Sequence, residues 1–375
     1  GQVYHAVIEK FCPGPAPDCN IQTQLNNDEF PSVIELARTG ITGIACIGCS
    51  INNSEHVISM STSDFATINL TAAVGTVASI SVKDVLTNYP AGTFAGFNIK
   101  NLKLVGLDLL SGITIRTYKD SVLQESSSVS TLLSLNSSLL NGTGEQLVGF
   151  VTTQSFDEIK FEITNLLGVL NVTQVYSGVI EKFCPGPMLP CNEPVAITSP
   201  EYPVFVNGVH TGINGIACIG CSVNNTNHLL DSDTTNYASI IMVVNVGTTG
   251  SISVKDQLTD YSAGNFAGFD ILNTNILNAT LLDAITVRTY LDGVLRETKT
   301  GLTQLVSVNS SLITNDGRRT VGFVTNLTFD EVTLELDADI LGVELGVTRV
   351  YSGILEGFCP VDLECNQTYW LTSAE

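Results

Sequence analysis

Polar and apolar residues alternate in short runs along much of the chain. The clearest runs place Ile, Val, Phe or Leu at every second position and lie at 79–84, 113–118, 158–163, 251–256, 285–290 and 331–337. A period of two puts successive side chains on opposite faces of a β-strand, so each run predicts a half-buried antiparallel strand. No long amphipathic helix is evident, and the Leu-rich stretches 102–110 and 276–282 could each form a short helical turn or a buried strand.

Turn sequences separate these runs. Asp292-Gly293 follows one predicted strand and indicates a hairpin, whereas the matching position earlier in the chain holds Asp120-Ser121, a weaker turn sequence. Many short strands at intervals of about ten residues predict an all-β fold. We therefore expect tandem antiparallel β-sandwich domains of the jelly-roll or Ig-like kind, with about eight or more strands each.

The strand pattern is repeated. Val3-Tyr4, Val175-Tyr176 and Val350-Tyr351 each open a similar stretch that contains a Phe-Cys-Pro triplet, at spacings of 172 and 175 residues. A period this long is a whole domain rather than a solenoid repeat. The last apolar run of each copy continues into Val-Tyr, so one long final strand through these residues is expected.

The position of this final strand sets the predicted domain boundaries. The stretches 20–38 and 192–210 contain Pro and polar residues and are interpreted as linkers. The expected segments are 1–19, the terminal strand and disulfide loop of a preceding repeat (an orphan or donor strand), 20–191, repeat one, 192–365, repeat two, and 366–375, the start of the next linker. The first residue is Gly1, which suggests a processed protein or an excised segment.

The ten cysteines fall in close pairs: Cys12 and Cys19, Cys46 and Cys49, Cys184 and Cys191, Cys218 and Cys221, and Cys359 and Cys365. The third copy contains only its first pair, so we expect every pair to close locally as a small disulfide. A four-cysteine zinc site in each copy and a redox-active Cys-x-x-Cys remain alternatives. Disulfides indicate an oxidising compartment, and hence a secreted or cell-surface protein.

Composition narrows the expected partners. The net charge is −21, and an acidic surface repels phosphate backbones, so a nucleic-acid partner is not expected. No apolar run approaches 18 residues, so membrane insertion is not expected either. The hydrophobic fraction of 44% is ample for packed cores.

One metal site is a candidate. Asp231, Asp233 and Asn236 place hard oxygen ligands at nearby positions, as in a calcium-binding loop. Copy one has Ser59 and Ser61 in place of the two aspartates, which confines any such site to repeat two. Turns of the D-x-D type without metal are common, and calcium is the one cofactor considered.

The other shared polar residues have two interpretations. His56 and His228 are equivalent and are interpreted as hydrogen-bonded structural residues, because no nucleophile accompanies them. The Lys83-Asp84 and Lys255-Asp256 pairs, like Arg116 and Arg288, lie in predicted strands and indicate a charged outer face with cross-strand ion pairs. The alternative is a ligand-binding sheet face.

The segment CIGCSVNNTNHLLDSDTTNYASI, followed by SISVKD, AGNFAGFDI, ITVRTY, VNSSLI, VGFVT and FDEV, carries a family resemblance. It is similar to repeat modules of large secreted or surface-anchored proteins of Bacteroidota, many of which carry gliding-motility or type 9 secretion sorting domains. The resemblance covers about 39–176 and 211–351. It implies a surface adhesin or stalk and no catalytic residues.

Together these observations predict an extracellular structural or adhesive repeat segment of a long cell-surface adhesin or filament, which gives reach and multivalent contact. The alternative is a pair of carbohydrate-binding, lectin-like modules, which rests on fold analogy. The expected partners are further copies of the repeat or neighbouring subunits, through strand addition, and surface glycans. No acidic or nucleophilic cluster is shared by the copies, so an enzyme is not expected.

Overall fold

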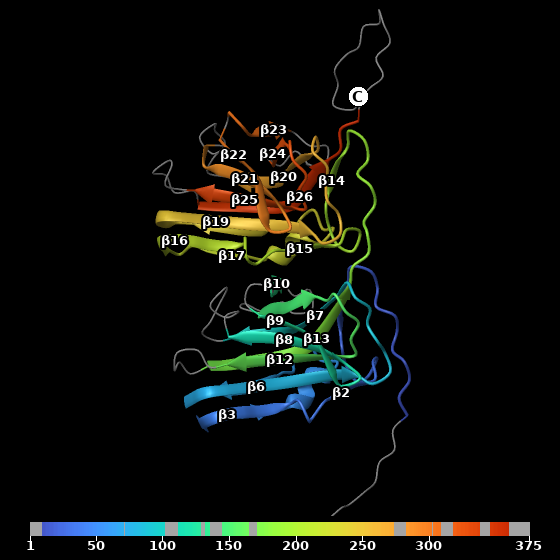
Figure 1. Ribbon diagram of the computed structural model, residues 1–375. Coiled ribbons are helices and arrows are strands. Elements are labelled where there is room, and N and C mark those ends of the chain that lie inside the picture. Colours follow the sequence, from blue (N-terminus) through green and yellow to red (C-terminus); the bar gives the residue numbers. More distant parts are fainter. Residues whose placement is uncertain are drawn as a thin grey trace, which may run out of the picture. The chain divides into compact units, whose positions relative to one another are not determined.

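The computed structural model describes residues 10–359, except 71, 102–111, 129–131, 136–144, 165–170, 274–282, 302, 309–317 and 338–345. The chain divides into two compact units, Gly1–Lys182 and Phe183–Glu375, called unit one and unit two (Figure 1). Among the described residues, no helix has the length and apolar character needed to cross a membrane.

Unit one is built from antiparallel strands. They are β1 (Gln22–Gln24), β2 (Ser32–Ile34), β3 (Gly40–Ile47), β4 (Ser50–Asn52), β5 (Ala66–Leu70), β6 (Ala72–Asp84), β7 (Thr93–Asn101), β8 (Ile113–Lys119), β9 (Val122–Ser128), β10 (Leu133–Leu135), β11 (Glu145–Val151), β12 (Glu158–Thr164) and β13 (Asn171–Lys182), with the short 3-10 helix η1 (Ser54–Ile58). One sheet has the order β10-β11-β7-β13-β5-β4 with β1 beside β13, and the other has the order β2-β6-β12-β8-β9 with β3 beside β6.

Unit two repeats this topology. Its strands are β14 (Pro194–Ala196), β15 (Val204–Val206), β16 (Gly212–Ile219), β17 (Ser222–Asn224), β18 (Ala238–Met242), β19 (Val244–Asp256), β20 (Phe266–Asn273), β21 (Ile285–Leu291), β22 (Val294–Thr300), β23 (Val306–Val308), β24 (Arg319–Val324), β25 (Glu331–Asp337) and β26 (Gly346–Glu356), with η2 (Thr226–Leu229). The sheets have the orders β17-β18-β26-β20-β24-β23, with β14 beside β26, and β15-β19-β25-β21-β22, with β16 beside β19. The predicted fold class, tandem antiparallel β-sandwiches, is confirmed.

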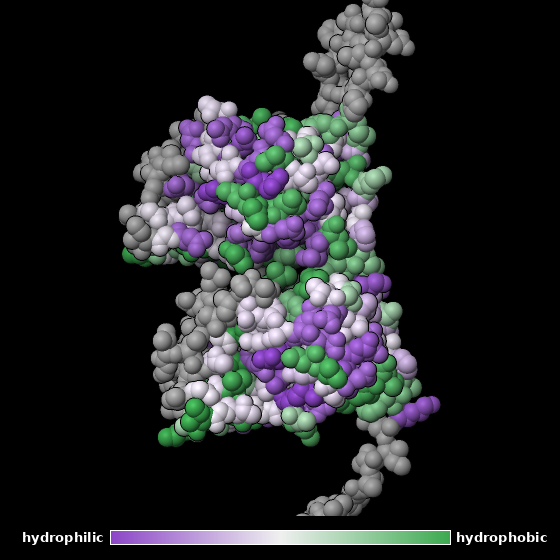
Figure 2. All heavy atoms as spheres, in the orientation of Figure 1, coloured by the Kyte–Doolittle hydropathy of each residue, from purple (hydrophilic) through white to green (hydrophobic). Residues whose placement is uncertain are grey.

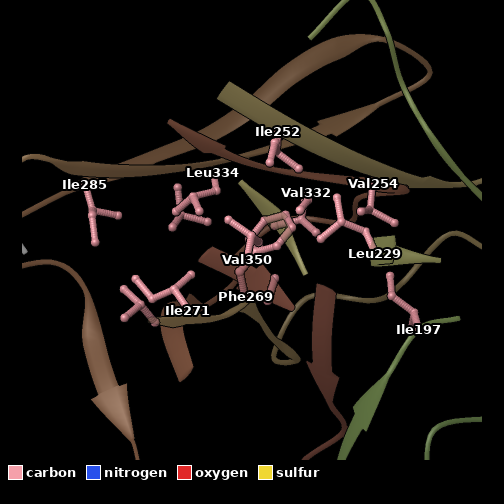
Figure 3. Close-up of a cluster of buried hydrophobic side chains, with 14 of the residues drawn as sticks. Ile197, Leu229, Ile252, Val254, Phe269, Ile271, Ile285, Val332, Leu334 and Val350 are labelled. Atoms are coloured by element: carbon pink, nitrogen blue, oxygen red, sulfur yellow. The ribbon is translucent and has the colours of Figure 1, made fainter. Parts of the chain in front are cut away.

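The alternating runs supply the cores between the sheets. In unit one, Ile80 and Val82 of β6 are fully buried, and Phe97 packs 5.8 Å from Phe161 between ring centroids. In unit two the equivalent cluster is built around Ile252, Phe269 and related side chains (Figure 3). On the face seen in Figure 2, apolar patches lie among polar ones in both units.

The two hairpins predicted from unequal turn sequences have the same turn. Asp292 and Gly293 join β21 to β22 with φ values of 51° and 75°, and Asp120 and Ser121 join β8 to β9 with 49° and 68°. Positive φ costs a serine more than a glycine, and the long strand pairings on either side hold it there. The Leu-rich stretches 102–110 and 276–282, which had two interpretations, lie entirely outside the described residues.

The final strand of each unit is long and central, as expected. β13 passes through Val175 and pairs with β1, β5 and β7, and β26 pairs with β14, β18 and β20. The stretches interpreted as linkers belong to the sheets instead, because β1, β2, β14 and β15 lie in them. Val204, Phe205 and Val206 of β15 are buried. Three-residue strands beside Pro are too short to give a strand pattern.

The cysteines pair partly as expected. Cys46–Cys49 and Cys218–Cys221 close locally, which is confirmed. The local pairing of Cys184 with Cys191 and of Cys359 with Cys365 is wrong, since Cys191 is bonded to Cys359 across 168 residues. Cys12 is free and exposed, so its expected bond to Cys19 is also wrong.

The physical reason is that the start and end of each unit lie side by side. Cys191 forms an isolated bridge to Gly357, and Asn192 N donates to Gly357 O at 2.6 Å. In unit one Cys19 bridges Lys182 in the same way, and Cys19 and Cys184 are both disulfide-bonded. Cys365, residues 366–375 and residues 1–9 of the segment 1–19, which was predicted to be an orphan or donor strand with its disulfide loop, lie outside the described residues.

A carboxyl group is buried near the end of each long strand. Glu181 of β13 is 5% exposed, and burial raises its pKa to about 7 although a hydrogen bond from Gln22 opposes the shift. The equivalent Glu356 is half-buried, and burial also raises its pKa.

Breaking the long-range disulfide should destabilise unit two far more than breaking the local one. Because Cys191–Cys359 closes a loop of 168 residues, the paired change Cys191→Ser and Cys359→Ser is expected to lower the free energy of unfolding by about 5 kcal/mol. The matched control, Cys218→Ser with Cys221→Ser, should cost about 2 kcal/mol because that loop is short. Denaturant unfolding measures both, and equal losses would contradict the pairing.

Glu181 should make unit one less stable at neutral pH than at low pH. Its folded pKa of about 7 exceeds the reference value of 4.5, so its contribution is fully present below about pH 4.5 and is lost as the pH rises to about 7. The loss amounts to about 3 kcal/mol. We expect Glu181→Gln to remove this slope, measured by urea unfolding from pH 4 to pH 8, and Glu356→Gln to leave the unit-one slope unchanged.

Candidate functional site

Unit two contains a pocket of about 120 Å³, enough room for several water molecules. We call it the unit-two pocket; most of its lining residues are polar, although apolar atoms contribute most of the surface that faces the pocket. The lining residues are Ala196, Thr198, Asp231, Ser232, Asp233, Thr234, Asp270, Arg318, Tyr351 and Ser352. They come from β14 and the residues just after it, from β20 and β26, from the loop between η2 and β18, and from the residue that precedes β24.

A β-bulge sets the floor of the pocket. The register between β20 and β26 shifts where Asp270 faces Ser352 and Ile271 faces Val350, which leaves Tyr351 as the extra residue. Bulges of this kind turn a side chain away from the regular alternation. The Arg318 guanidinium carbon lies 3.5 Å above the Tyr351 ring centroid, and Arg318 Nη1 donates to Thr234 O at 2.7 Å. The cation is therefore held against an aromatic face and the acidic loop.

The loop 230–236 supplies two carboxylates. Asp231 Oδ1 accepts a hydrogen bond from Asp233 N at 2.9 Å, and Asp231 Oδ2 accepts one from Asn236 Nδ2 at 2.9 Å. Asp233 is exposed and accepts from both the hydroxyl and the amide of Thr235, which lowers its pKa. Asp233 is thus an ionised acceptor at neutral pH, and the loop hydrogen bonds fix the directions of both side chains.

A third carboxylate lies deeper. Asp270 of β20 is 3% exposed, lines the pocket and accepts a hydrogen bond from the Thr320 hydroxyl. The pocket therefore combines fixed acceptors with one planar five-donor cation, a set suited to a ligand that both donates and accepts hydrogen bonds.

The equivalent positions of unit one carry different chemistry. Tyr176 is again the extra residue of a bulge, between Val175 and Ser177. Aligning the repeats places Glu145 where unit two has Arg318, and Asn98 where it has Asp270. The scaffold is shared, but the charges around the tyrosine are replaced or reversed.

Two further positions near Tyr351 also differ between the units. Arg349 lies 4.6 Å from the Tyr237 ring, which packs edge-on against Tyr351 at 5.6 Å. The aligned residues of unit one are Gln174 and Phe65, and Phe65 packs 5.3 Å from Tyr176. Both units therefore have an aromatic pair here, whereas the arginine above the pair in unit two is replaced by Gln174 in unit one.

The predicted calcium ligands lie together in this loop. Asp231 and Asp233 line the pocket, and Asn236 holds Asp231 through its amide. The oxygens of both aspartates accept hydrogen bonds within the loop, as in a D-x-D turn. Within the described part of the chain, no group of three or more His, Cys, Asp or Glu side chains is arranged to hold a metal. Calcium binding by the aspartates stays a prediction.

The sequence pattern missed Arg318, Asp270 and Tyr351. Val350-Tyr351 was the marker of the repeat, but nothing in its strand pattern indicates a bulge. Arg318 and the acidic loop are more than eighty residues apart in sequence, and the strand pairing of β20 with β24 and β26 brings them together. His228 has a structural partner, since its Nδ1 lies 3.1 Å from Tyr237 O. The Cys-x-x-Cys pairs are disulfides, which disagrees with the zinc alternative.

The charged outer face occurs where the pattern predicted it. Arg116 pairs with Glu162 at 2.9 Å and Arg288 with Glu335 at 3.1 Å, and each ion pair joins two neighbouring strands. The two aspartates assigned to this face are an exception: Asp84 and Asp256 are each 1% exposed. Asp84 accepts a hydrogen bond from the Tyr89 hydroxyl at 2.8 Å and two from the backbone of the following turn, so it holds the turn from inside.

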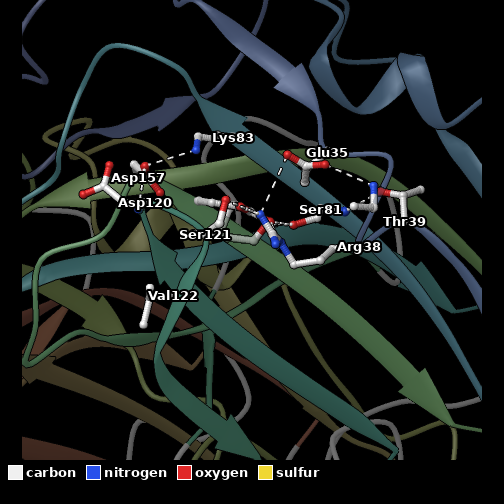
Figure 4. A network of polar contacts seen from close by, with 12 residues as sticks. Glu35, Arg38, Thr39, Ser81, Lys83, Asp120, Ser121, Val122 and Asp157 are labelled. Atoms are coloured by element: carbon white, nitrogen blue, oxygen red, sulfur yellow. Dashed lines mark hydrogen bonds and ion pairs between the residues drawn. The ribbon is translucent and has the colours of Figure 1, made fainter.

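A second polar cluster is structural (Figure 4). The Glu158 side chain is fully buried and accepts two hydrogen bonds of 2.5 Å from Arg38, Nε to Oε1 and Nη2 to Oε2. Arg38 also lies 4.7 Å above the Tyr118 ring. In unit two His210 takes the place of Arg38, 2.7 Å from Glu331 Oε1, and is stacked on Tyr290. Both clusters close the sheet edge near the start of β3 or β16.

No family model and no curated protein sequence matches the chain. Among solved structures, it is similar to allantoicase from Saccharomyces cerevisiae, with 10% identity over 87% of this chain and 94% of that chain and a TM-score of 0.29. It is also similar to the CBM32-1 and CBM32-2 domains of Clostridium perfringens ZmpB in complex with GalNAc, with 8% identity over 92% and 100% and a TM-score of 0.27. It is similar as well to the CBM22-1-CBM22-2 tandem domain of Paenibacillus barcinonensis Xyn10C, with 8% identity over 93% of this chain and 99% of that chain and a TM-score of 0.25.

The TM-scores of these likenesses all lie below 0.5, so the β-sandwich is established by the strand pairing and not by them. The expectation that the chain is not an enzyme is withdrawn, because it rested on an absence and allantoicase is among the similar structures. The absence of a catalytic cluster shared by the repeats was too weak a reason, because the repeats differ at the pocket.

Removing the Arg38 guanidinium should cost far more than removing an exposed one. Arg38→Ala leaves the Glu158 carboxylate buried without its partner, and the expected loss is about 3–5 kcal/mol in the unfolding of unit one. The control Arg116→Ala breaks a more exposed pair and should cost less than about 1 kcal/mol. Urea unfolding followed by far-UV circular dichroism measures both variants. Similar losses of unfolding free energy would contradict a structural role for the buried pair.

Proposed function

We propose that the chain is an extracellular pair of β-sandwich modules that binds carbohydrate through the unit-two pocket. The observation that carries the proposal is the fixed set of Arg318, Asp231 and Asp233 around Tyr351. Sugars present neighbouring hydroxyls that each donate and accept hydrogen bonds. Carboxylates accept from such hydroxyls, and a guanidinium donates to them in a planar fork.

Charge supports a neutral ligand. The chain carries a net charge of −21, and the pocket holds three carboxylates beside one guanidinium, which disfavours phosphates and other polyanions. A neutral sugar has no such penalty. The two CBM tandems of similar fold are named as carbohydrate-binding modules, one with GalNAc bound, which is consistent with this ligand class.

The location proposed is outside the cell. Several disulfides in one chain are typical of oxidising compartments. Membership of a longer surface protein of the Bacteroidota repeat type, with adhesive and multivalent contact, is a further proposal that rests on the sequence resemblance. In such a protein, weak sugar sites gain apparent affinity from repetition.

A glycan array probed with the full chain tests the proposal. We expect binding to neutral glycans, and Arg318→Glu, which installs the residue of unit one, should weaken it about tenfold to hundredfold through the loss of charge-assisted hydrogen bonds. Asp231→Ser with Asp233→Ser should have a similar effect. Glu145→Ala, at the aligned position of unit one, is the matched control and should leave binding unchanged.

Running the array with added calcium and with a chelator separates the two roles of the aspartates. Binding that survives chelation but fails in the aspartate variant means direct contact with sugar, whereas binding lost on chelation supports the calcium loop. A chain that binds no glycan, or that binds equally in all variants, contradicts the proposal.

A further inference from the structure

The chain enters and leaves unit two at one point. β14 pairs antiparallel with the end of β26, with Pro194 opposite Glu356 and Ala196 opposite Ile354. Just outside this pairing, the amide of Cys359 donates to Asn192 Oδ1 at 3.1 Å, and the Cys191–Cys359 disulfide joins the two segments. The disulfide therefore lies at the open end of the pairing, before the first pair of strand residues.

Without the disulfide this arrangement is mechanically weak. When two antiparallel strands are pulled apart from the same end, their hydrogen bonds are loaded one after another rather than together. β14 has only three residues, and single backbone hydrogen bonds contribute little each. Tension would therefore peel β14 from β26 and expose the central strand of the larger sheet to the load.

We infer that the disulfide lets unit two bear tension without unfolding. A pull applied through the chain before Cys191 and after Cys359 passes through the covalent bond between their sulfur atoms. The intervening residues, across a sequence separation of 168, carry none of that pull and remain folded beside the loaded path. The mechanical function is thus separate from sugar binding and does not depend on it.

Unit one has the features needed for the same role. Cys19 of unit one and Cys184, which lies two residues after the last residue of that unit, occupy the equivalent positions and are each disulfide-bonded. Asn20 N donates to Lys182 O at 2.8 Å. Between Cys184 and Cys191 the sequence is PGPMLP, and proline-rich segments are semi-rigid spacers. The segment from Cys184 to Cys191 is therefore short and contains little slack chain.

Single-molecule force spectroscopy of the full chain, with handles at both ends, tests the inference. For the oxidised protein we expect no extension step from unit two. For Cys191→Ser with Cys359→Ser we expect a new step of roughly 550–600 Å, the extended length of the released segment. The control Cys218→Ser with Cys221→Ser releases a loop between residues three apart and should add no such step.

Adding a thiol reductant to folded wild-type molecules held under load avoids the question of whether the variant folds. The same long step should then appear after reduction, because exchange breaks the bond in a protein that is already folded. A full-length step in the oxidised protein overturns the inference, as does the absence of any new step after reduction. Peptide mapping that finds Cys191 bonded to Cys184 also overturns it.

Discussion

The structure depends on where the last strand of each unit lies. β13 and β26 are the last described strands of their units, yet each is central in the larger sheet and pairs with three other strands. The first strand can find its partner only when the last one is in place. Such non-local pairing costs loop-closure entropy before it gives any stabilisation. The Cys191–Cys359 disulfide holds the first and last strands of unit two together and so offsets this cost once it has formed.

The regular part of this arrangement could be predicted from the sequence. Alternation in 79–84 or 285–290 reports one buried sheet face directly, because a half-buried strand has a period of two. The disulfide pairing could not be predicted in this way. Spacing along the chain favours Cys184 with Cys191, whereas the actual neighbour of Cys191 is set by β14 lying beside β26, and β14 is too short to leave a pattern.

Only the part of the pocket that is local in sequence could be predicted. Asp231 and Asp233 lie close in sequence and could be recognised as a cluster of oxygen ligands. Arg318 and Asp270 reach the same place only through strand pairing, and the bulge at Tyr351 depends on a register shift between two strands. Comparison of the repeats nevertheless contained a signal: Asp231, Asp233, Asp270 and Arg318, which line the pocket, all differ in charge from the aligned residues of unit one. Repetition of the fold with divergence at one rim is how a scaffold acquires distinct contacts without new topology.

The long-range disulfide has a consequence for how the protein is made. During synthesis Cys191 emerges shortly after Cys184, while Cys359 emerges 168 residues after Cys191. Short loops close much faster than long ones, so the first bond available to a new Cys191 thiol is a wrong one. Correct maturation therefore requires that early bonds be reopened by thiol–disulfide exchange until the last strand arrives. The yield of folded protein then depends on the isomerase capacity of the compartment as much as on the sequence.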